Sequence, residues 1–423
     1  MRYTELSDWL RWQESLHSSE IDMGLERVRA VAEKMGLLTP EAKVVSIAGT
    51  NGKGSCVATF EALCLSQGLR VGAFTSPHLL RYNERIRINS LEVDDQEICE
   101  SFERIDQARG DISLTYFEFG TLAAIDIFQQ RGVDIMVLEV GLGGRLDAVN
   151  IMDADVAIVT SIALDHQDWL GSDINLIGHE KAGIYRPHRW AICADEAAPA
   201  TVADYAHDIG SYWVSMGMSL NVSVSDDGKH WDWQGVTEEG DFIDYSDLPV
   251  PQLPLPSVAA ALQGFVLLGH SLPGDLHELL KNLQLSGRAQ KIVSNGVHYL
   301  LDVAHNPAAA ELLARRLAGE VCQGATHVVV AMMKDKDRAG VFSALLDVVD
   351  QWHVAELEGN ARAASGALLL DDLQQLGCSA ESYDSVTQAL NHLASQVSES
   401  DRVVVMGSFF TVAEALSVLA VGA

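Results

Sequence analysis

Hydrophobic and polar residues alternate along this chain with two different periods, which predicts short strands separated by amphipathic helices. The first 45 residues favour helix, because Trp9, Leu10, Trp12 and Leu16 recur at helical spacing. From Lys43 onward, short apolar runs predict strands at 43–48, 70–75, 133–140 and 155–162. The stretches between them predict helices at 55–67, 94–108, 116–131 and 173–184. Such alternation indicates a parallel sheet that is covered on both faces.

The pattern changes in residues 217–247, which are rich in Asp, Gly and Trp. Alternation in LNVSVS and the aromatic residues of HWDWQ predict a small antiparallel meander. The proline-dense segment DLPVPQLPLPS (247–257) disfavours both helix and central strand. Helices are expected after it, at 257–268 and 274–284.

A second α/β run begins near Arg288 and predicts an independent C-terminal domain of nucleotide-binding type. Its expected strands are 297–303, 326–332 and 402–406. Its expected helices are 307–318, 339–350 and 411–420.

The composition is that of an ordinary globular protein, with 48% hydrophobic and 21% charged residues among 423. No run of about 18 apolar residues predicts a membrane span. The N-terminal segment MRYTELSDWLRWQESLH lacks the apolar stretch of a signal peptide. The sequence therefore leads us to expect a cytoplasmic protein, made up of two or three domains, that has no membrane partner.

The formal net charge is −30, and a surface of this sign repels nucleic acid and anionic lipid. We expect no nucleic-acid partner, although the acidic excess can equally serve only for solubility. An anionic substrate would need local cations or a metal ion. The six cysteines show no metal-binding spacing, which argues against zinc and favours reduced thiols.

The strongest functional signal is SIAGTNGKGS (46–55), which follows an apolar strand and precedes a helix. Its three glycines allow a tight turn whose N–H groups face an anion, and the helix N-terminus adds a favourable dipole. Lys53 would reach the β- and γ-phosphates of a nucleotide, and the Ser55 hydroxyl would bind magnesium. The spacing carries one more Gly than the usual GxxxxGK[ST] pattern. The alternative is a glycine-rich turn with an exposed lysine.

Two residues near strand ends are candidate metal ligands. Glu139 closes the apolar run IMVLE, where a carboxylate is costly unless it is paired or binds metal. Pairing with Arg145 or another cation is the alternative. His166 lies just beyond the next strand, on the same edge of the sheet, and is otherwise a packed loop residue.

Lys181 is the third candidate, on a predicted helix between Ile177 and Ile184. Apolar surroundings depress a lysine pKa, and a neutral amine can take up carbon dioxide to form a carbamate. The carbamate would be an anionic metal ligand. An ordinary salt-bridged lysine is the alternative.

Six motifs occur in order: GTNGKGS, TSPHLLRYNERIRI (75–88), LEVGLGGRLDA, TSIALDHQDWLG, GHEKAGI and DVAHNPAA (302–309). Together they resemble the folylpolyglutamate synthase family, within the wider group of ATP-dependent amide ligases that includes the muramyl peptide ligases. IDMGLERV (21–28) and DISLTYFEFGTLAA (111–124) resemble the pterin-binding segments of bifunctional bacterial members. The resemblance covers nearly the whole chain. It implies a P-loop domain (1–285), a smaller Rossmann-like ligase domain (286–423) and an active site between them.

The resemblance also implies site residues, with ATP and Mg²⁺ as cofactors. The ATP-binding residues would be Gly49, Thr50, Asn51, Gly52, Lys53, Gly54, Ser55, Ser257, Arg288 and Asp302. The metal ligands would be Ser55, Ser76, Glu139, His166 and a carbamylated Lys181, and Lys53, His166 and Lys181 would be catalytic. The pterin site would contain Asp22, Met23, Gly24, Leu25, Thr115, Tyr116, Phe117, Glu118 and Leu146, and the incoming glutamate would contact His305 and Ser408. The family usually carries Asn where this chain has Ser257, which puts that adenine contact in doubt.

The implied reaction passes the γ-phosphate of ATP to the carboxylate of dihydropteroate or of a tetrahydrofolate. The amine of L-glutamate then displaces phosphate from the acyl phosphate. We expect a monomer that has only these small molecules as partners.

Three alternatives remain open. A muramyl peptide ligase would need a UDP-binding domain before the loop, and only 48 residues precede Gly49. A nucleotide switch would not need the TYFE segment or a second α/β domain. An enzyme that only extends folates would not need the pterin segments, although the sequence does not give relative rates.

Overall fold

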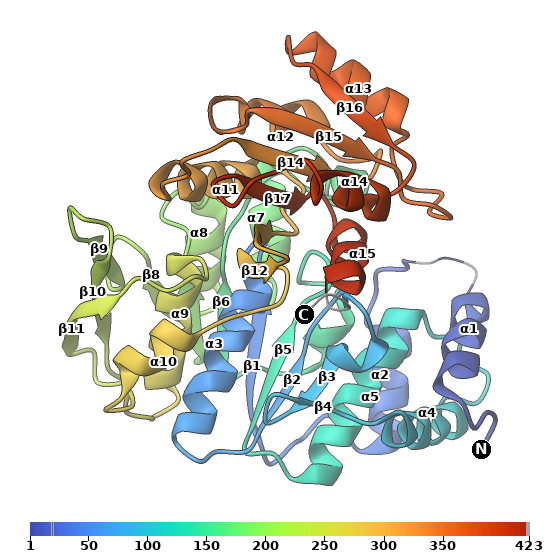
Figure 1. Ribbon diagram of the computed structural model, residues 1–423. Helices are drawn as coiled ribbons and strands as arrows, with labels where there is room; N and C mark the ends of the chain where they lie inside the picture. Colours follow the sequence, from blue (N-terminus) through green and yellow to red (C-terminus); the bar gives the residue numbers. More distant parts are fainter. Residues whose placement is uncertain (18, 20, 420–423) are drawn as a thin grey trace. The chain divides into compact units, whose positions relative to one another are not determined.

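The computed structural model describes residues 1–17, 19 and 21–419, and the chain divides into two compact units, Met1–Leu283 and Gln284–Ala423. Both units are α/β, with helices packed against a sheet (Figure 1). The fold class expected from the sequence is confirmed.

An eight-stranded sheet forms the centre of the first unit, in the order β4-β3-β2-β5-β1-β6-β7-β8. Its strands are β1 (Lys43–Ala48), β2 (Val71–Phe74), β3 (Ile86–Ile88), β4 (Leu91–Glu92), β5 (Ile135–Glu139), β6 (Val156–Val159), β7 (Trp190–Cys193) and β8 (Tyr212–Ser215). Six of these strands are parallel, while β3 and β4 extend the edge in antiparallel pairing. The carboxyl ends of β2, β5, β1 and β6 therefore lie side by side along one edge.

Helices cover both faces of this sheet because its strands are apolar on both sides. One face packs with helices α1 (Leu6–Leu16), α2 (Glu26–Met35), α4 (Asp95–Arg109), α5 (Tyr116–Arg131) and α8 (Ala200–Asp208) in one hydrophobic core. The other face carries α3 (Lys53–Ser66) and α9 (Leu255–Leu267), where Phe60, Ile158 and Gly264 meet. Short elements complete the unit: η1 (Tyr82–Arg85), η2 (Ala148–Ile151), α6 (Gln167–Leu170), α7 (Ile174–Ala182) and α10 (Leu276–Asn282).

The predicted meander is present as a three-stranded antiparallel sheet in the order β11-β10-β9. It is made of β9 (Asn221–Val224), β10 (His230–Val236) and β11 (Phe242–Pro249). The proline-dense segment contributes the end of β11 and the start of α9, and residues 250–254 between them are irregular.

The second unit contains a six-stranded sheet in the order β12-β13-β17-β14-β15-β16. Only β12 is antiparallel to its neighbour. The strands are β12 (Gln290–Ser294), β13 (Val297–Leu301), β14 (Thr326–Val330), β15 (Gln351–Ala355), β16 (Ala380–Tyr383) and β17 (Arg402–Met406). Its helices are α11 (Pro307–Gly319), α12 (Arg338–Ser343), η3 (Leu346–Val348), α13 (Gly366–Gln375), α14 (Val386–Leu393) and α15 (Phe409–Leu419).

Within the described residues, one expected helix is interrupted. Residues 339–350 were predicted as a single helix, but the segment forms the short helix α12 and the separate turn η3. None of the described helices combines the length and the apolar character that a bilayer crossing requires.

Candidate functional site

The phosphate loop lies between β1 and α3, as the sequence predicted, and the end of β6 holds its backbone. The Thr50 amide donates to the Ser161 carbonyl (2.8 Å), and the Asn51 amide donates to the Ser161 hydroxyl (2.9 Å). The Thr160 hydroxyl donates to the Asn51 carbonyl (2.7 Å). These bonds fix the loop before any ligand binds, which is the preorganisation that an anion site needs.

Two loop positions accept only glycine. Gly49 has φ +149°, and a Cβ there would lie 1.9 Å from the Thr160 hydroxyl oxygen. Gly52 has φ +85°, and its Cβ would lie 2.2 Å from the hydroxyl oxygen of Ser257 on α9. A side chain at either position would clash, and the positive φ at Gly52 is also strained for other residues. The same contact places Ser257 beside the phosphate loop.

Lys53 and Ser55 lie in the first turn of α3. The Lys53 ammonium donates to the Gly49 carbonyl (3.0 Å) and the Thr50 carbonyl (3.4 Å), so it lies over the loop. The Ser55 side chain is fully buried, and its hydroxyl oxygen has no hydrogen-bond partner among the described residues. A buried hydroxyl without a partner is costly, and a cation at this point would satisfy its oxygen.

The loop that follows β5 is organised by a residue that the sequence reading missed. Asp147 is buried, and its carboxylate accepts from the amides of Gly141 (3.1 Å), Leu142 (2.9 Å) and Val149 (3.0 Å). Burial raises the pKa of Asp147 to about 6, although these amides and the charge of Lys53 act in the opposite direction. The effect of Lys53 shows that this loop faces the phosphate loop.

Glu139 itself is buried at the end of β5, and its charge affects the pKa of a residue on α3, the helix after the phosphate loop. Burial, and after it the Glu139 carboxylate, raises the pKa of the Cys56 thiol on α3. Arg145, the partner weighed for Glu139, instead pairs with Glu180 on α7, with nitrogen–oxygen distances of 2.9 and 2.7 Å.

Lys181 is buried on α7, and among the described residues its ammonium makes neither a hydrogen bond nor an ion pair. Burial and then the charge of Lys53 lower the pKa of Lys181 to about 7, while Asp165 and Asp147 act in the opposite direction. The backbone of Lys181 lies close to Gly144, because a Cβ there would be 2.6 Å from the Glu180 carbonyl and 3.0 Å from the Lys181 Cα. Lys181 therefore faces the same edge as Lys53 and Asp147.

Ser76 and His166 complete the predicted metal ligands. Ser76 follows β2 and precedes a cis peptide bond to Pro77, while His166 is exposed and has a left-handed φ of +52°. Because β2, β5, β1 and β6 are parallel neighbours, Ser76, Glu139 and the phosphate loop follow strand ends on one edge, with His166 a few residues beyond β6. Among the described residues, no three His, Cys, Asp or Glu side chains form a metal-binding group. A cation here would need hydroxyl, carbamate or phosphate oxygens as well.

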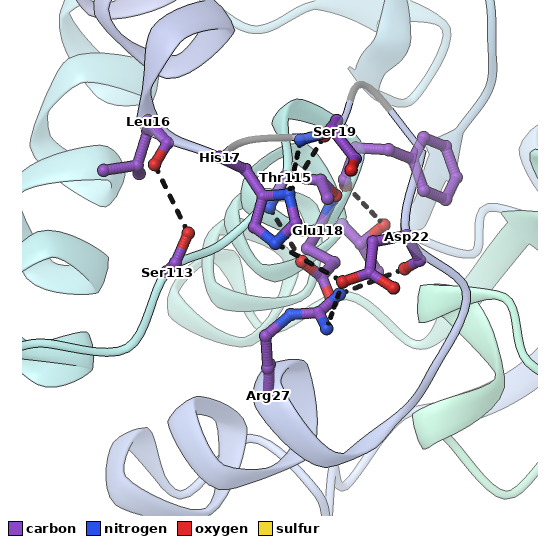
Figure 2. A network of polar contacts seen from close by, with 10 residues as sticks. Leu16, His17, Ser19, Asp22, Arg27, Ser113, Thr115 and Glu118 are labelled. Atoms are coloured by element: carbon purple, nitrogen blue, oxygen red, sulfur yellow. Dashed lines mark hydrogen bonds and ion pairs between the residues drawn. The ribbon is translucent and has the colours of Figure 1, made fainter.

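The two predicted pterin segments lie together, since Asp22 and Glu118 both contact Arg27 (Figure 2). They also meet the loop after β5: a Cβ at Gly141 would lie 2.7 Å from the Phe117 ring, and one at Gly143 would lie 3.3 Å from Met23. The predicted substrate segments are thus adjacent to the loop that carries Leu146.

In the second unit, Arg288 and Asp302 both lie near the start of β12. The Arg288 guanidinium lies 4.9 Å from the centre of the Phe409 ring. Asp302 is partly buried and accepts from the amides of Ala289 (2.9 Å) and Ala304 (2.8 Å). Burial raises the pKa of Asp302, and Arg288 opposes that effect.

The predicted glutamate-binding residues follow two neighbouring strands of this unit, β13 and β17. The ring nitrogen Nδ1 of His305 lies 2.8 Å from the Val303 carbonyl oxygen. Ser408 is buried, and its hydroxyl lies 2.7 Å from that of Thr411 at the start of α15. Both therefore lie at the carboxyl edge of this sheet.

Asp147 and Arg27 contact the predicted site segments although the sequence gave them no role, and the sequence named Arg145 only as an alternative partner of Glu139. Asp147 and Arg145 are part of LEVGLGGRLDA, and Arg27 is part of IDMGLERV, so each stood inside a recognised motif. The sequence signal that could have pointed to these residues was a charged side chain near glycines or at the start of a helix. Which partner each one contacts depends on tertiary structure that the spacing does not reveal.

Comparison with known proteins supports the same class of site. Residues 287–409 match the family described as Mur ligase, glutamate ligase domain. The chain is 44% identical over 415 residues to the dihydrofolate synthase/folylpolyglutamate synthase of Escherichia coli (strain K12), covering 98% of this chain and 95% of the relative. It is 37% identical to the Haemophilus influenzae protein of the same name, with 97% and 96% covered.

Solved structures are similar over nearly the full length. Escherichia coli FolC in complex with DHPP and ADP has a TM-score of 0.93 at 44% identity, covering 99% of this chain and 98% of that chain. The bifunctional folylpolyglutamate synthase/dihydrofolate synthase of Yersinia pestis, complexed with AMPPNP and Mn ion, has a TM-score of 0.91 at 44% identity, with 98% of each chain covered.

A phosphate loop at the edge of a parallel sheet, joined in one chain to a glutamate ligase domain, defines an ATP-dependent ligase. At 44% identity over 98% of its length with the E. coli relative, the chain belongs to the dihydrofolate synthase/folylpolyglutamate synthase family. The family resemblance stated from the motifs is confirmed.

Proposed function

We propose that this enzyme joins L-glutamate to 7,8-dihydropteroate and to the glutamate tail of tetrahydrofolates, with ATP and Mg²⁺ as cofactors. The observation that carries the proposal is the phosphate loop itself. Thr160 and Ser161 fix its backbone, and Gly52 leaves no room for a Cβ. Just after the loop, the buried Ser55 hydroxyl has no hydrogen-bond partner within the described part of the chain. A triphosphate and a cation would satisfy these groups together.

The residues at the strand ends suit a hard cation. Ser55, Ser76 and Glu139 offer oxygen, and His166 offers an imidazole nitrogen, at one edge of the sheet. Magnesium prefers oxygen ligands and commonly keeps several from substrate phosphates and water. When bound, it would supply charge neutralisation on the phosphates.

The phosphate loop would hold ATP through the backbone of Gly49 to Gly54 and through Lys53. The γ-phosphate passes to the substrate carboxylate, whose oxygen forms the new phosphorus–oxygen bond as ADP leaves. The glutamate amine then attacks the acyl carbon, loses a proton and displaces phosphate. The Lys53 ammonium, which already lies over the loop carbonyls, would follow the charge of the transferring phosphoryl group.

Lys181 would act as a carbamate. Its amine is buried and has a pKa of about 7, so a substantial fraction is neutral at physiological pH. The neutral nitrogen would attack carbon dioxide and release a proton, which turns a buried cation into an anionic oxygen ligand. That change would also remove the unfavourable pairing of its charge with Lys53.

The remaining predicted contacts divide between the two units. We assign the pterin to the segments Asp22–Leu25 and Thr115–Glu118 and to Leu146. We assign Ser257, Arg288 and Asp302 to ATP, and His305 and Ser408 to the incoming glutamate. These assignments come from the motifs. The clustering of the two pterin segments around Arg27 supports the assignment of those segments.

We further propose a cytoplasmic monomer. The six cysteines are free thiols, and four of them are buried, which suits a reducing compartment.

An assay of the purified protein tests the proposal. With ATP, Mg²⁺ and L-glutamate, dihydropteroate or a tetrahydrofolate should give ADP and a product one glutamate heavier by mass spectrometry. Lys53→Ala should abolish both. ADP release that does not depend on glutamate would contradict the proposal and favour a nucleotide switch.

A further inference from the structure

Arg27 connects two segments that are distant in the sequence but adjacent in the fold (Figure 2). It lies in the first turn of α2. One terminal nitrogen of its guanidinium lies 2.7 Å from a carboxylate oxygen of Asp22. The other donates to the Asp22 carbonyl (3.0 Å) and to the carboxylate of Glu118 (3.1 Å).

Glu118 links Arg27 to the backbone of the second segment, Thr115–Glu118, because its carboxylate contacts both. Its other carboxylate oxygen accepts from the Thr115 amide (2.7 Å), while the Thr115 hydroxyl accepts from the Glu118 amide (3.2 Å). This reciprocal cap fixes the start of α5. The side chain of Glu118 is only 4% exposed. Arg27 thus holds the backbone at Asp22 directly, and the backbone at Thr115 through one buried carboxylate.

Further contacts fasten the two segments upstream of these residues. The His17 ring lies 3.4 Å from the Asp22 carboxylate, and the Ser113 hydroxyl donates to the Leu16 carbonyl (3.3 Å). The chain leading into Asp22 is therefore tied to the chain leading into α5 at a second point.

The guanidinium is specifically suited to this role. It presents donors in a rigid planar fork, whereas the ammonium of lysine is a point charge on a flexible stem. The Nε of Arg27 is buried and has no hydrogen-bond partner among the described residues, which costs free energy. The contacts of the two terminal nitrogens must offset that cost.

We propose that Arg27 is a positioning residue for the pteroate substrate, because it holds the Asp22–Leu25 and Thr115–Glu118 segments in one arrangement through Asp22 and Glu118. The inference rests on the proposed assignment of these segments to the pterin. Arg27 lies on α2, whereas the phosphate loop lies between β1 and α3, and the polar partners of Arg27 are Asp22 and Glu118. We therefore expect its loss to affect the carboxylate substrate and not ATP.

Steady-state kinetics of Arg27→Gln and Arg27→Lys test the proposal. Loss of charged hydrogen bonds from an ordered site costs on the order of tenfold in binding. For Arg27→Gln the KM for dihydropteroate should rise by about that factor, while the KM for ATP and the affinity for ADP stay unchanged. Arg27→Lys should restore little, because one ammonium cannot make the same contacts on both sides.

Arg29→Gln is the matched control, since Arg29 lies two residues further along the same helix and forms no ion pair with any residue that the structure describes. It should leave both KM values unchanged. A merely structural role for Arg27 would lower the melting temperature of Arg27→Gln and leave the KM for dihydropteroate as in the wild type, which would overturn the proposal. An equal rise in both KM values would overturn it too.

The two failures are distinguishable. A wild-type enzyme that makes no product from dihydropteroate would refute the proposed function. A wild-type enzyme that uses dihydropteroate, beside an Arg27→Gln variant with the same KM, would refute only the role of Arg27. If Arg27→Gln does not bind ADP and is therefore misfolded, Arg27→Lys decides, and a wild-type KM in that variant overturns the proposal.

Discussion

Single residues decide whether the phosphate loop can form, and Gly52 is the clearest case. It combines a φ of +85° with the hydroxyl of Ser257 only 2.2 Å from where a Cβ would lie. A non-glycine residue in such a conformation costs roughly 1–3 kcal/mol before any clash is counted. The loop is thus sensitive to one methyl group.

We expect Gly52→Ala to weaken ADP binding by about tenfold or more, because strain of roughly 1–3 kcal/mol falls directly on the loop that binds the phosphates. Calorimetric titration with ADP measures this without any need for catalysis. The double variant Gly52→Ala/Ser257→Ala removes the nearest oxygen and should recover part of the loss. Wild-type affinity in Gly52→Ala would show that the loop does not bind the nucleotide.

Lys181 gives a second prediction at this scale. Lys181→Ala should be inactive because it lacks the oxygen ligand that the carbamate would supply, and short carboxylates such as acetate should restore measurable activity. Labelled bicarbonate should give a carbamate signal by carbon NMR in the wild type. Lys181→Gln is the control that lacks the amine. If acetate does not rescue Lys181→Ala and the wild type shows no carbamate signal, Lys181 is an ordinary buried lysine.

The sequence predicted the positions of these residues better than their contacts. The loop glycines, Lys53 and Lys181 stood in motifs whose chemistry is explicit, so their placement near the sheet edge followed from strand order. Asp147 was overlooked because its role, accepting three backbone amides, depends on how its own loop folds back. Ser257 lies beside Gly52 of the phosphate loop, and its predicted contact with the adenine stays a prediction.

At the scale of elements, strands β14, β15 and β16 carry a polar chain that runs from two buried histidines to an exposed glutamate and plays no part in the proposed chemistry. The Nδ1 of His327 lies 3.2 Å from the Nε2 of His353, whose Nδ1 lies 3.3 Å from the Tyr383 hydroxyl. That hydroxyl donates to Glu381 (2.5 Å). Burial, followed by the charge of His327, lowers the pKa of His353 to about 4, and burial lowers the pKa of His327 as well.

These shifts predict acid sensitivity. Both histidines stay neutral in the folded state where an unfolded histidine, with a pKa near 6.5, would gain a proton. The unfolded state therefore binds more protons between about pH 6.5 and 4, and stability falls as the pH is lowered through that window. The melting temperature of His353→Gln should decline less over this range than that of the wild type. Parallel declines would contradict the prediction.

Several elements were predicted well, whereas the helices α8, α13 and α14, the inner strand β7 and the short edge strands were not. The strand at 402–406 and the helix at 116–131 appear with the expected bounds. Strands β3 and β4 were missed because they have only three and two residues and exist by pairing at an edge. β15 and β16 carry His353, Glu381 and Tyr383, whose polarity hides the strand pattern.

The net charge of −30 matters for the whole molecule. Self-repulsion of this size destabilises a compact state, and salt screens it, since the Debye length falls from about 30 Å at 0.01 M to about 10 Å at 0.1 M. The melting temperature should rise by a few degrees between roughly these concentrations of sodium chloride. The double variant Glu238→Gln/Glu239→Gln removes two exposed carboxylates on the meander, so its melting temperature should rise less with salt. A melting temperature that salt does not raise would contradict the argument.

The fold class of the whole chain followed from the alternation of strand and helix, because continuous apolar strands require cover on both faces. The order of the strands did not follow. β1 lies between β5 and β6, which come roughly ninety residues or more later, and local pattern carries no information about such pairing.

That separation has a consequence for biosynthesis. The loop sequence is complete once Ser55 has been added. Thr160 and Ser161, which hold its backbone, and Ser257, which lies beside it, are translated long afterwards. A growing chain on the ribosome would therefore contain the motif before it could bind a nucleotide. Fragments that stop before α9 should remain unable to do so.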